Sequence, residues 1–118
     1  MNVSENYDEF NPRQIISDFL EADKCIMNTD EEKGSIYSQI SYVYCEAIKD
    51  YKTSKMYAEK SIKFGAEIGY LILGNCYFEE GNYDEAIKSY KNISSRHPDY
   101  ITAQRNIKAA ETRKNIQF

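Results

Sequence analysis

The sequence is poor in the residues that carry chemistry at most active sites and metal sites. It has one histidine, three cysteines without a Cys-x-x-Cys pair, no tryptophan and two prolines in 118 residues. A lone histidine with no cysteine nearby in the sequence cannot build a usual zinc site. No nucleophile elbow, phosphate-binding glycine loop or His-Glu-x-x-His pattern is present in the sequence. We therefore expect no cofactor and no enzyme activity.

Long apolar runs are also missing. No stretch approaches the ~20 apolar residues that cross a bilayer. The first thirty residues lack a basic segment followed by an apolar one, which is the pattern of a secretory signal. The three widely spaced cysteines are typical of reduced thiols. The expected location is the cytoplasm, with no membrane partner.

Charge is distributed unevenly along the chain. The formal net charge is −4, and it divides into −6 for residues 1–33, zero for residues 34–98 and +2 for residues 99–118. Nucleic-acid binding needs clustered Lys and Arg, so no nucleic-acid partner is expected. The acidic N-terminal third favours a basic protein partner. A solvated surface that merely keeps a small protein soluble explains the same charges.

Apolar residues recur at helical spacing in six segments, without strand-like alternation. Asn11 before Pro12, Thr29 with Glu32, and Asn82 are helix-start signals. A glycine follows the third segment and another follows the fourth, as expected at helix ends. We predict an all-α protein whose helices cover residues 12–28, 29–49, 53–64, 67–80, about 82–93 and 99–116.

The helix pairs repeat along the chain. Ile40-Ser41-x-x-Tyr44 aligns with Leu73-Gly74-x-x-Tyr77 at an offset of 33 residues, whereas the second helices, around Ser54 and Ala86, align at 32. The earlier pair therefore has one extra residue in its internal turn. A period in this range is typical of helix-pair solenoids, in which no pair can bury its apolar face alone. Gly74 is expected to let the paired helices approach closely, and Tyr90 to pack toward the following pair.

One pair carries a family pattern. Tyr70-x-x-Leu73-Gly74-x-x-Tyr77, then Ala86-x-x-x-Tyr90 and Pro98, resembles a tetratricopeptide repeat over residues 67–100. Residues 34–66, with Ser41 and Ser54 where Gly and Ala are usual, are similar to the wider superfamily that includes Sel1-like repeats. The resemblance implies a single domain, a short right-handed α-solenoid of about six antiparallel helices. Its parts would be a flexible N-terminus (1–11), a degenerate half repeat (12–33), a divergent repeat (34–66), a tetratricopeptide repeat (67–100) and a capping helix (101–118).

The resemblance also implies where a protein or peptide partner would bind. Both families hold partners on the concave face, which is lined by the first helix of each pair. Carried across by position, that face would present Tyr42, Glu46, Ile68, Leu71, Asn75, Phe78, Glu79, Arg105 and Asn106. Leu71 and Phe78 would either anchor the partner or pack against the neighbouring unit.

Three functions stay open on these grounds. The first is a non-catalytic adaptor that holds a short linear segment in the concave groove. The second is a small acidic inhibitor of the immunity or antitoxin type, which would cover a basic toxin such as a nuclease. The third is an assembly or secretion chaperone.

Overall fold

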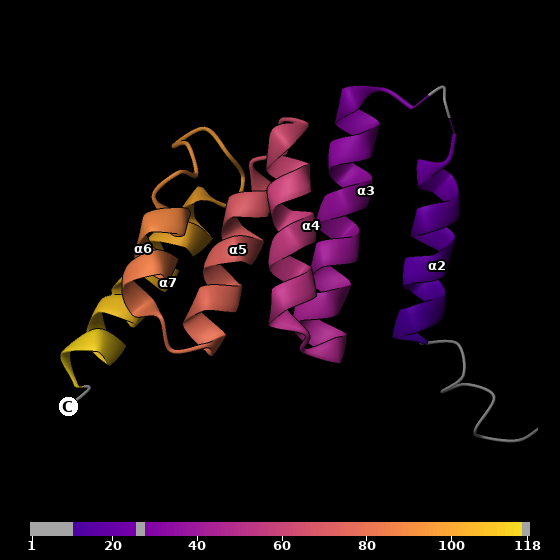
Figure 1. Ribbon diagram of the computed structural model, residues 1–118. Helices are drawn as coiled ribbons and strands as arrows, with labels where there is room; N and C mark the ends of the chain where they lie inside the picture. The colour runs from indigo at the N-terminus through magenta and orange to yellow at the C-terminus, as the bar shows by residue number, and fades with distance from the viewer. Residues whose placement is uncertain (1–10, 26–27, 117–118) are drawn as a thin grey trace, which may run out of the picture.

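The computed structural model describes residues 11–25 and 28–116, and in these residues the chain is helical without any strand. Successive helices pack against one another in a stack of 48 × 38 × 23 Å (Figure 1), which confirms the predicted all-α fold and short helical solenoid. The predicted flexible N-terminus falls almost wholly outside the described residues. The helices are α2 (Pro12–Asp23), α3 (Asp30–Val43), α4 (Tyr51–Lys63), α5 (Ile68–Glu79), α6 (Tyr83–Tyr90) and α7 (Tyr100–Asn115), and a π-helical turn, η1 (Tyr44–Ile48), continues α3.

The helix-start signals in the sequence are confirmed. The side chain of Asn11 accepts hydrogen bonds from the first backbone amides of α2. Thr29 and Glu32 form a reciprocal capping box, with Oγ1 of Thr29 3.1 Å from the amide of Glu32 and Oε1 of Glu32 3.0 Å from the amide of Thr29. Asn82 caps α6 by accepting from the amide of Glu85 at 3.4 Å. Each cap satisfies donors that a helix start leaves unpaired.

The first helix is shorter than predicted. The apolar pattern indicated residues 12–28, but α2 ends at Asp23. The carbonyl oxygen of Ala22 accepts from the amide of Cys25, three residues on, at 3.2 Å and from the side-chain amide of Asn28 at 2.7 Å, so these two donors satisfy the end of the helix. Ile26 and Met27, which the pattern assigned to this helix, lie outside the described residues.

Two other boundaries differ from the prediction for similar local reasons. α4 begins at Tyr51 rather than near Thr53, because the side chain of Asp50 caps it by accepting from the amide of Thr53 at 3.1 Å. α6 ends at Tyr90, whereas the pattern extended it to Ile93. Ile93 is nevertheless buried in the core. The residue is apolar because the turn after α6 packs against the core, and not because the helix continues to it.

The extra residue of the earlier pair lies in η1. In the later pair the amide of Asn82 donates to the carbonyl of Tyr77, five residues back, at 2.8 Å. In the earlier pair the equivalent bond runs from Asp50 to Tyr44, six residues back, at 2.9 Å. The turn Tyr44–Ile48 therefore closes the same way with one more residue, and the insertion widens the helix end into a π turn.

The closest helix approach differs from the one expected. Gly74 faces the ring of Tyr90, and a Cβ atom there would lie 2.5 Å from Cε1 of that ring. The close backbone approach lies at Gly69, where a Cβ would sit 2.7 Å from the carbonyl oxygen of Ala58 in α4. Tyr90 thus packs within its own pair as well as against Ala103 of the following helix.

Two buried serines hold α3 against α4. Oγ of Ser41 donates to the carbonyl of Ser54 at 2.7 Å, and Oγ of Ser54 donates back to the carbonyl of Ser41 at 2.7 Å. The thiol of Cys76 in α5 also donates to Oγ of Ser54 at 3.1 Å. Buried hydroxyls are tolerated when they are hydrogen-bonded, which explains serine where the related repeats have Gly and Ala.

Candidate partner-binding surface

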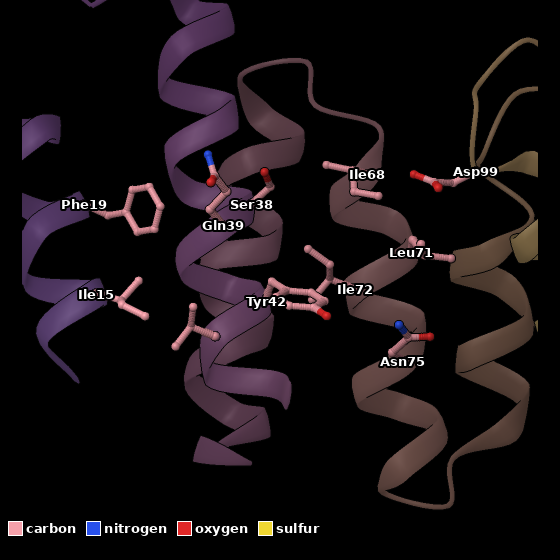
Figure 2. A pocket seen from close by; sticks show the side chains of 11 residues that line it. Ile15, Phe19, Ser38, Gln39, Tyr42, Ile68, Leu71, Ile72, Asn75 and Asp99 are labelled. Carbon is pink, nitrogen blue, oxygen red and sulfur yellow. The ribbon is translucent and has the colours of Figure 1, made fainter. Parts of the chain in front are cut away.

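An apolar groove of about 520 Å³ lies between α2, α3 and α5 (Figure 2). Figure 2 shows Phe19 projecting from α2 toward α3, and the ring of Tyr42 extending from α3 toward α5. Tyr42 is 57% exposed, which is unusual for so large a side chain in a helix-packed region. The groove is lined by Ile15, Phe19, Val43, Ile68, Leu71 and Ile72, together with Ser38, Gln39, Tyr42, Asn75 and Asp99.

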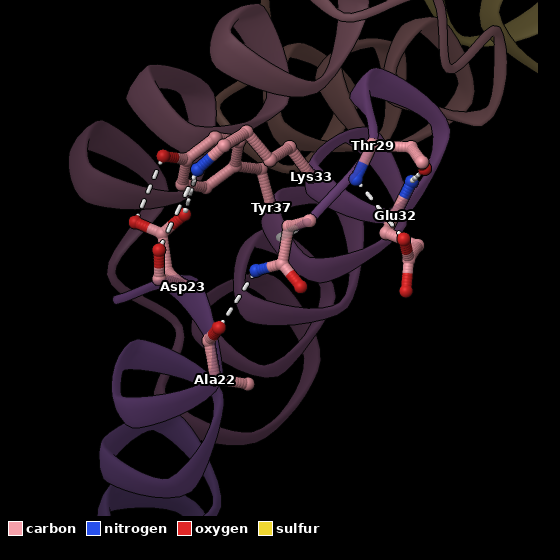
Figure 3. Close-up of polar contacts among 7 residues, drawn as sticks. Ala22, Asp23, Thr29, Glu32, Lys33 and Tyr37 are labelled. Atoms are coloured by element: carbon pink, nitrogen blue, oxygen red, sulfur yellow. Dashed lines mark hydrogen bonds and ion pairs between the residues drawn. The ribbon is translucent and has the colours of Figure 1, made fainter. Parts of the chain in front are cut away.

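The end of α2 is fixed to α3 by a polar cluster (Figure 3). The carboxylate of Asp23 accepts from the hydroxyl of Tyr37 at 2.9 Å and pairs with Nζ of Lys33 at 3.2 Å. Burial and the hydrogen bond to Asp23 raise the pKa of Tyr37, so its hydroxyl stays a donor. Together with the packing of Ile16 on Ile36 in the core, this cluster holds α2 where it lines one side of the groove.

Leu71 is placed for both roles that the sequence left open. It lines the groove, and it also packs against the buried cluster around Tyr90 and Ile107. Phe78 is held more firmly by its own chain, because Tyr83 meets its ring edge-on at 5.2 Å and the guanidinium of Arg113 lies 5.8 Å from its centroid. Leu71 is therefore the better anchor for an incoming side chain.

A second hollow, which we call the acidic recess, continues from the groove along α5. It has a volume of about 250 Å³ and shares Asn75 with the groove. Its other lining residues are Glu46, Phe78, Glu79, Tyr90, Asn106 and Ala109.

Asn75 stands at the junction with its orientation fixed. Its Oδ1 accepts from the hydroxyl of Tyr90 at 2.6 Å and from Nδ2 of Asn106 at 3.3 Å. Because both bonds use the oxygen, the amide nitrogen of Asn75 is the group left to donate. A backbone carbonyl of a bound segment is a suitable acceptor for it.

Two of the carboxylates on this surface form no ion pair within the described chain. Glu46 and Glu79 are both exposed, and neither forms an ion pair with a Lys or Arg among residues 11–25 and 28–116. Burial first, and then the negative charge of Glu79, raises the pKa of the nearby Tyr51. Asp99 adds a third carboxylate at the other end of the groove. Its Oδ2 lies 3.7 Å from Nδ1 of His97, and its backbone amide donates to the same ring nitrogen at 3.0 Å.

The structure brings together most of the residues that the resemblance indicated. Three of them lie in the groove with Asn75 (Tyr42, Ile68 and Leu71), and four line the recess with it (Glu46, Phe78, Glu79 and Asn106). Arg105 is exposed on α7 and lines neither hollow. The sequence reasoning missed the contributions of Ile15, Phe19, Val43, Ile72, Asp99, Tyr90 and Ala109. Ile15 and Phe19 are four residues apart, which predicts that they share one face of a helix. That spacing does not tell whether the face is buried in the core or lines a groove.

The described chain holds no cluster suited to a metal ion. Within residues 11–25 and 28–116, no three His, Cys, Asp or Glu side chains meet where they could hold one. The neighbouring thiol of Cys76 and then burial raise the pKa of Cys45, which favours its thiol form over the thiolate. None of the described helices is both long enough and apolar enough to cross a bilayer.

Comparison with known proteins supports the repeat assignment. Residues 68–100 match the family model of the tetratricopeptide repeat, which confirms the resemblance seen over 67–100. The matched residues are α5, α6 and the loop that leads into α7. No curated protein matches the chain. Tetratricopeptide repeats are in general protein-interaction scaffolds without catalytic chemistry, so the matched helix pair supports a protein-protein interaction module in general terms.

Proposed function

We propose that the chain is a non-catalytic adaptor that binds a segment of a protein partner in the groove between α2, α3 and α5. The observation that carries this proposal is the groove itself, an apolar hollow of about 520 Å³ bordered by the exposed ring of Tyr42. A hollow of this size accommodates a few side chains of a linear segment. It therefore favours the adaptor over the inhibitor and chaperone alternatives, which would cover a larger surface of a folded partner.

The chemistry of the groove suits such a segment. Leu71 and Phe19 are half-buried and offer apolar surface to an incoming aliphatic or aromatic side chain. Full burial of one such side chain contributes about 1.5–3 kcal/mol. The amide nitrogen of Asn75 is oriented to bind a backbone carbonyl, and Tyr42 is the kind of exposed aromatic that dominates many interfaces. The three free cysteines, of which Cys45 and Cys76 are buried and Cys25 is exposed, are in keeping with the cytoplasmic location expected from the sequence.

A peptide selection tests this proposal. The folded protein is used to select from a phage-displayed library of random twelve-residue peptides, and the affinity of the selected peptides is measured by fluorescence polarisation. Tyr42→Ser is expected to weaken binding about tenfold, since it removes an exposed interface aromatic without disturbing the core.

Met56→Ser is the matched control. Met56 is 48% exposed on α4 and lines neither the groove nor the recess, so its replacement removes a similar apolar side chain elsewhere. Affinity within twofold of wild type is expected for this variant. Equal weakening by the two substitutions, or none by either, would exclude the groove as the binding site.

A further inference from the structure

The groove and the acidic recess form one continuous surface along α5. They share Asn75, and the helix carries Leu71 in the groove and Glu79 in the recess. Eight residues separate these two positions, which corresponds to about 12 Å along the helix axis. An extended segment covers that distance with about four residues. A partner anchored at Leu71 therefore places a nearby side chain over the recess.

The recess offers negative charge to that side chain. Glu46 approaches from η1 and Glu79 from α5, so two carboxylates from different elements line one hollow of about 250 Å³. Three cations lie close to this surface, and none of them forms an ion pair with either carboxylate. Nζ of Lys49 donates to the backbone carbonyl of Glu46 at 3.4 Å, and Arg113 lies 5.8 Å from the centroid of the Phe78 ring. Lys55 is already paired with Glu80 at 2.7 Å. The charge on this surface is thus complementary to a basic side chain from outside.

We propose that the partner segment is basic, with a lysine or arginine about four residues from its apolar anchor, and that Glu46 and Glu79 bind this cation. The inference rests on the proposed binding of a segment in the groove and adds the chemistry that selects it. Asp99 lies at the opposite end of the groove and places a carboxylate on the other side of the Leu71 anchor. It therefore also favours a basic residue in the bound segment. An acidic segment is disfavoured by all three carboxylates.

The test uses three synthetic nine-residue peptides that differ only at their two end positions. Each is fluorescein-labelled, has leucine at its centre with alanine and serine around it, and carries lysine, norleucine or glutamate at both ends. The ends lie four residues from the centre in either chain direction, so the design does not depend on the orientation of the bound segment. Binding to the full chain is measured by fluorescence polarisation at 50 mM and 500 mM NaCl.

The lysine peptide is expected to bind about 3- to 10-fold more tightly than the norleucine peptide at low salt, as for one or two exposed ion pairs. The preference is expected to shrink at high salt, where exposed charges are screened. The double variant E46Q/E79Q should lose the preference, and E46K/E79K should favour the glutamate peptide. Glu59→Gln, which removes an exposed carboxylate on α4 outside both hollows, should leave the preference intact.

Two outcomes overturn the inference in distinguishable ways. Equal binding of the lysine and norleucine peptides, or a lysine preference that survives in E46Q/E79Q, refutes the role of the recess. A fourth peptide, with serine at the centre and lysine at the ends, tests the groove. If it binds as well as the leucine peptide, the proposed function fails along with the inference.

Discussion

Replacing Gly74 by alanine tests the packing on which the repeat depends. A Cβ atom at this position would lie 2.5, 2.6 and 2.9 Å from three atoms of the Tyr90 ring. Ordinary van der Waals contact of a Cβ begins near 3.4 Å, so the ring would have to move by nearly 1 Å. Tyr90 is only 1% exposed, and its hydroxyl is held by Asn75 at 2.6 Å, so both ends of the side chain resist that movement.

The expected effect is a net loss of stability. Alanine in place of glycine inside a helix gains about 1 kcal/mol from helix propensity. Overpacking of a filled core costs about 1–3 kcal/mol, and the rigid surroundings of Tyr90 place Gly74→Ala at or above the upper end of that range. We expect the free energy of unfolding to fall by about 2 kcal/mol or more. For a chain of this length that corresponds to a decrease of at least roughly 8 °C in Tm.

The measurement is urea and thermal unfolding followed by far-UV circular dichroism, with Gly34→Ala as the matched control. Gly34 also lies in a helix, but an added Cβ there would meet its nearest neighbour, Ala66, at 3.2 Å, which a small shift relieves. Gly34→Ala is expected within about 1 kcal/mol of wild type. In a Tyr90→Leu background the smaller side chain leaves room for the added Cβ, so Gly74→Ala should destabilise the protein less than it does in wild type. The coupling free energy between the two substitutions is expected to be at least about 0.5 kcal/mol. A Gly74→Ala protein as stable as the Gly34→Ala protein would refute the packing argument.

Two further predictions concern the first pair. Ser41→Ala and Ser54→Ala are each expected to cost about 1 kcal/mol, because each removes a buried hydrogen bond to a backbone carbonyl. The double variant should cost less than their sum, because either single substitution already removes the 3.2 Å contact between the two hydroxyls. A double-mutant cycle in urea measures this, and strict additivity would contradict it. The side chain and amide of Thr53 donate to Asp50 and lower its pKa, so its cap stabilises the fold above its ordinary pKa, near 4, and is lost as the pH falls through the lowered value. Asp50→Asn should therefore show a smaller decrease in Tm than wild type between pH 7 and pH 2.5, and parallel curves would argue against the cap.

Much of the candidate groove was predicted from position in the repeat. Leu71 and Asn75 lie one turn apart on α5, so helical spacing puts them on one face. Tyr42 in α3 is the equivalent of Asn75 at the 33-residue offset, so the repeat places it on the same face of the stack. The contribution of Phe19 did not follow from sequence, because it depends on how α2 docks through Asp23 and the Tyr37 hydroxyl. The position of Asn75 on this face was predicted, but the orientation of its amide was not. The oxygen of Asn75 accepts from the hydroxyl of Tyr90, so only the amide nitrogen is left to bind a partner, as a donor.

The sequence by itself determined the helices, their starts and the repeat, because caps, glycines and apolar spacing act within a few residues of chain. Only the tertiary structure decided which apolar side chains remain open to a partner, and which carboxylates remain without a cation. Exposure depends on atoms contributed by segments far apart in the chain, as where Glu46 and Glu79 meet in one recess. Local pattern shows that a side chain is apolar or charged, but the packed neighbours decide what it is free to bind.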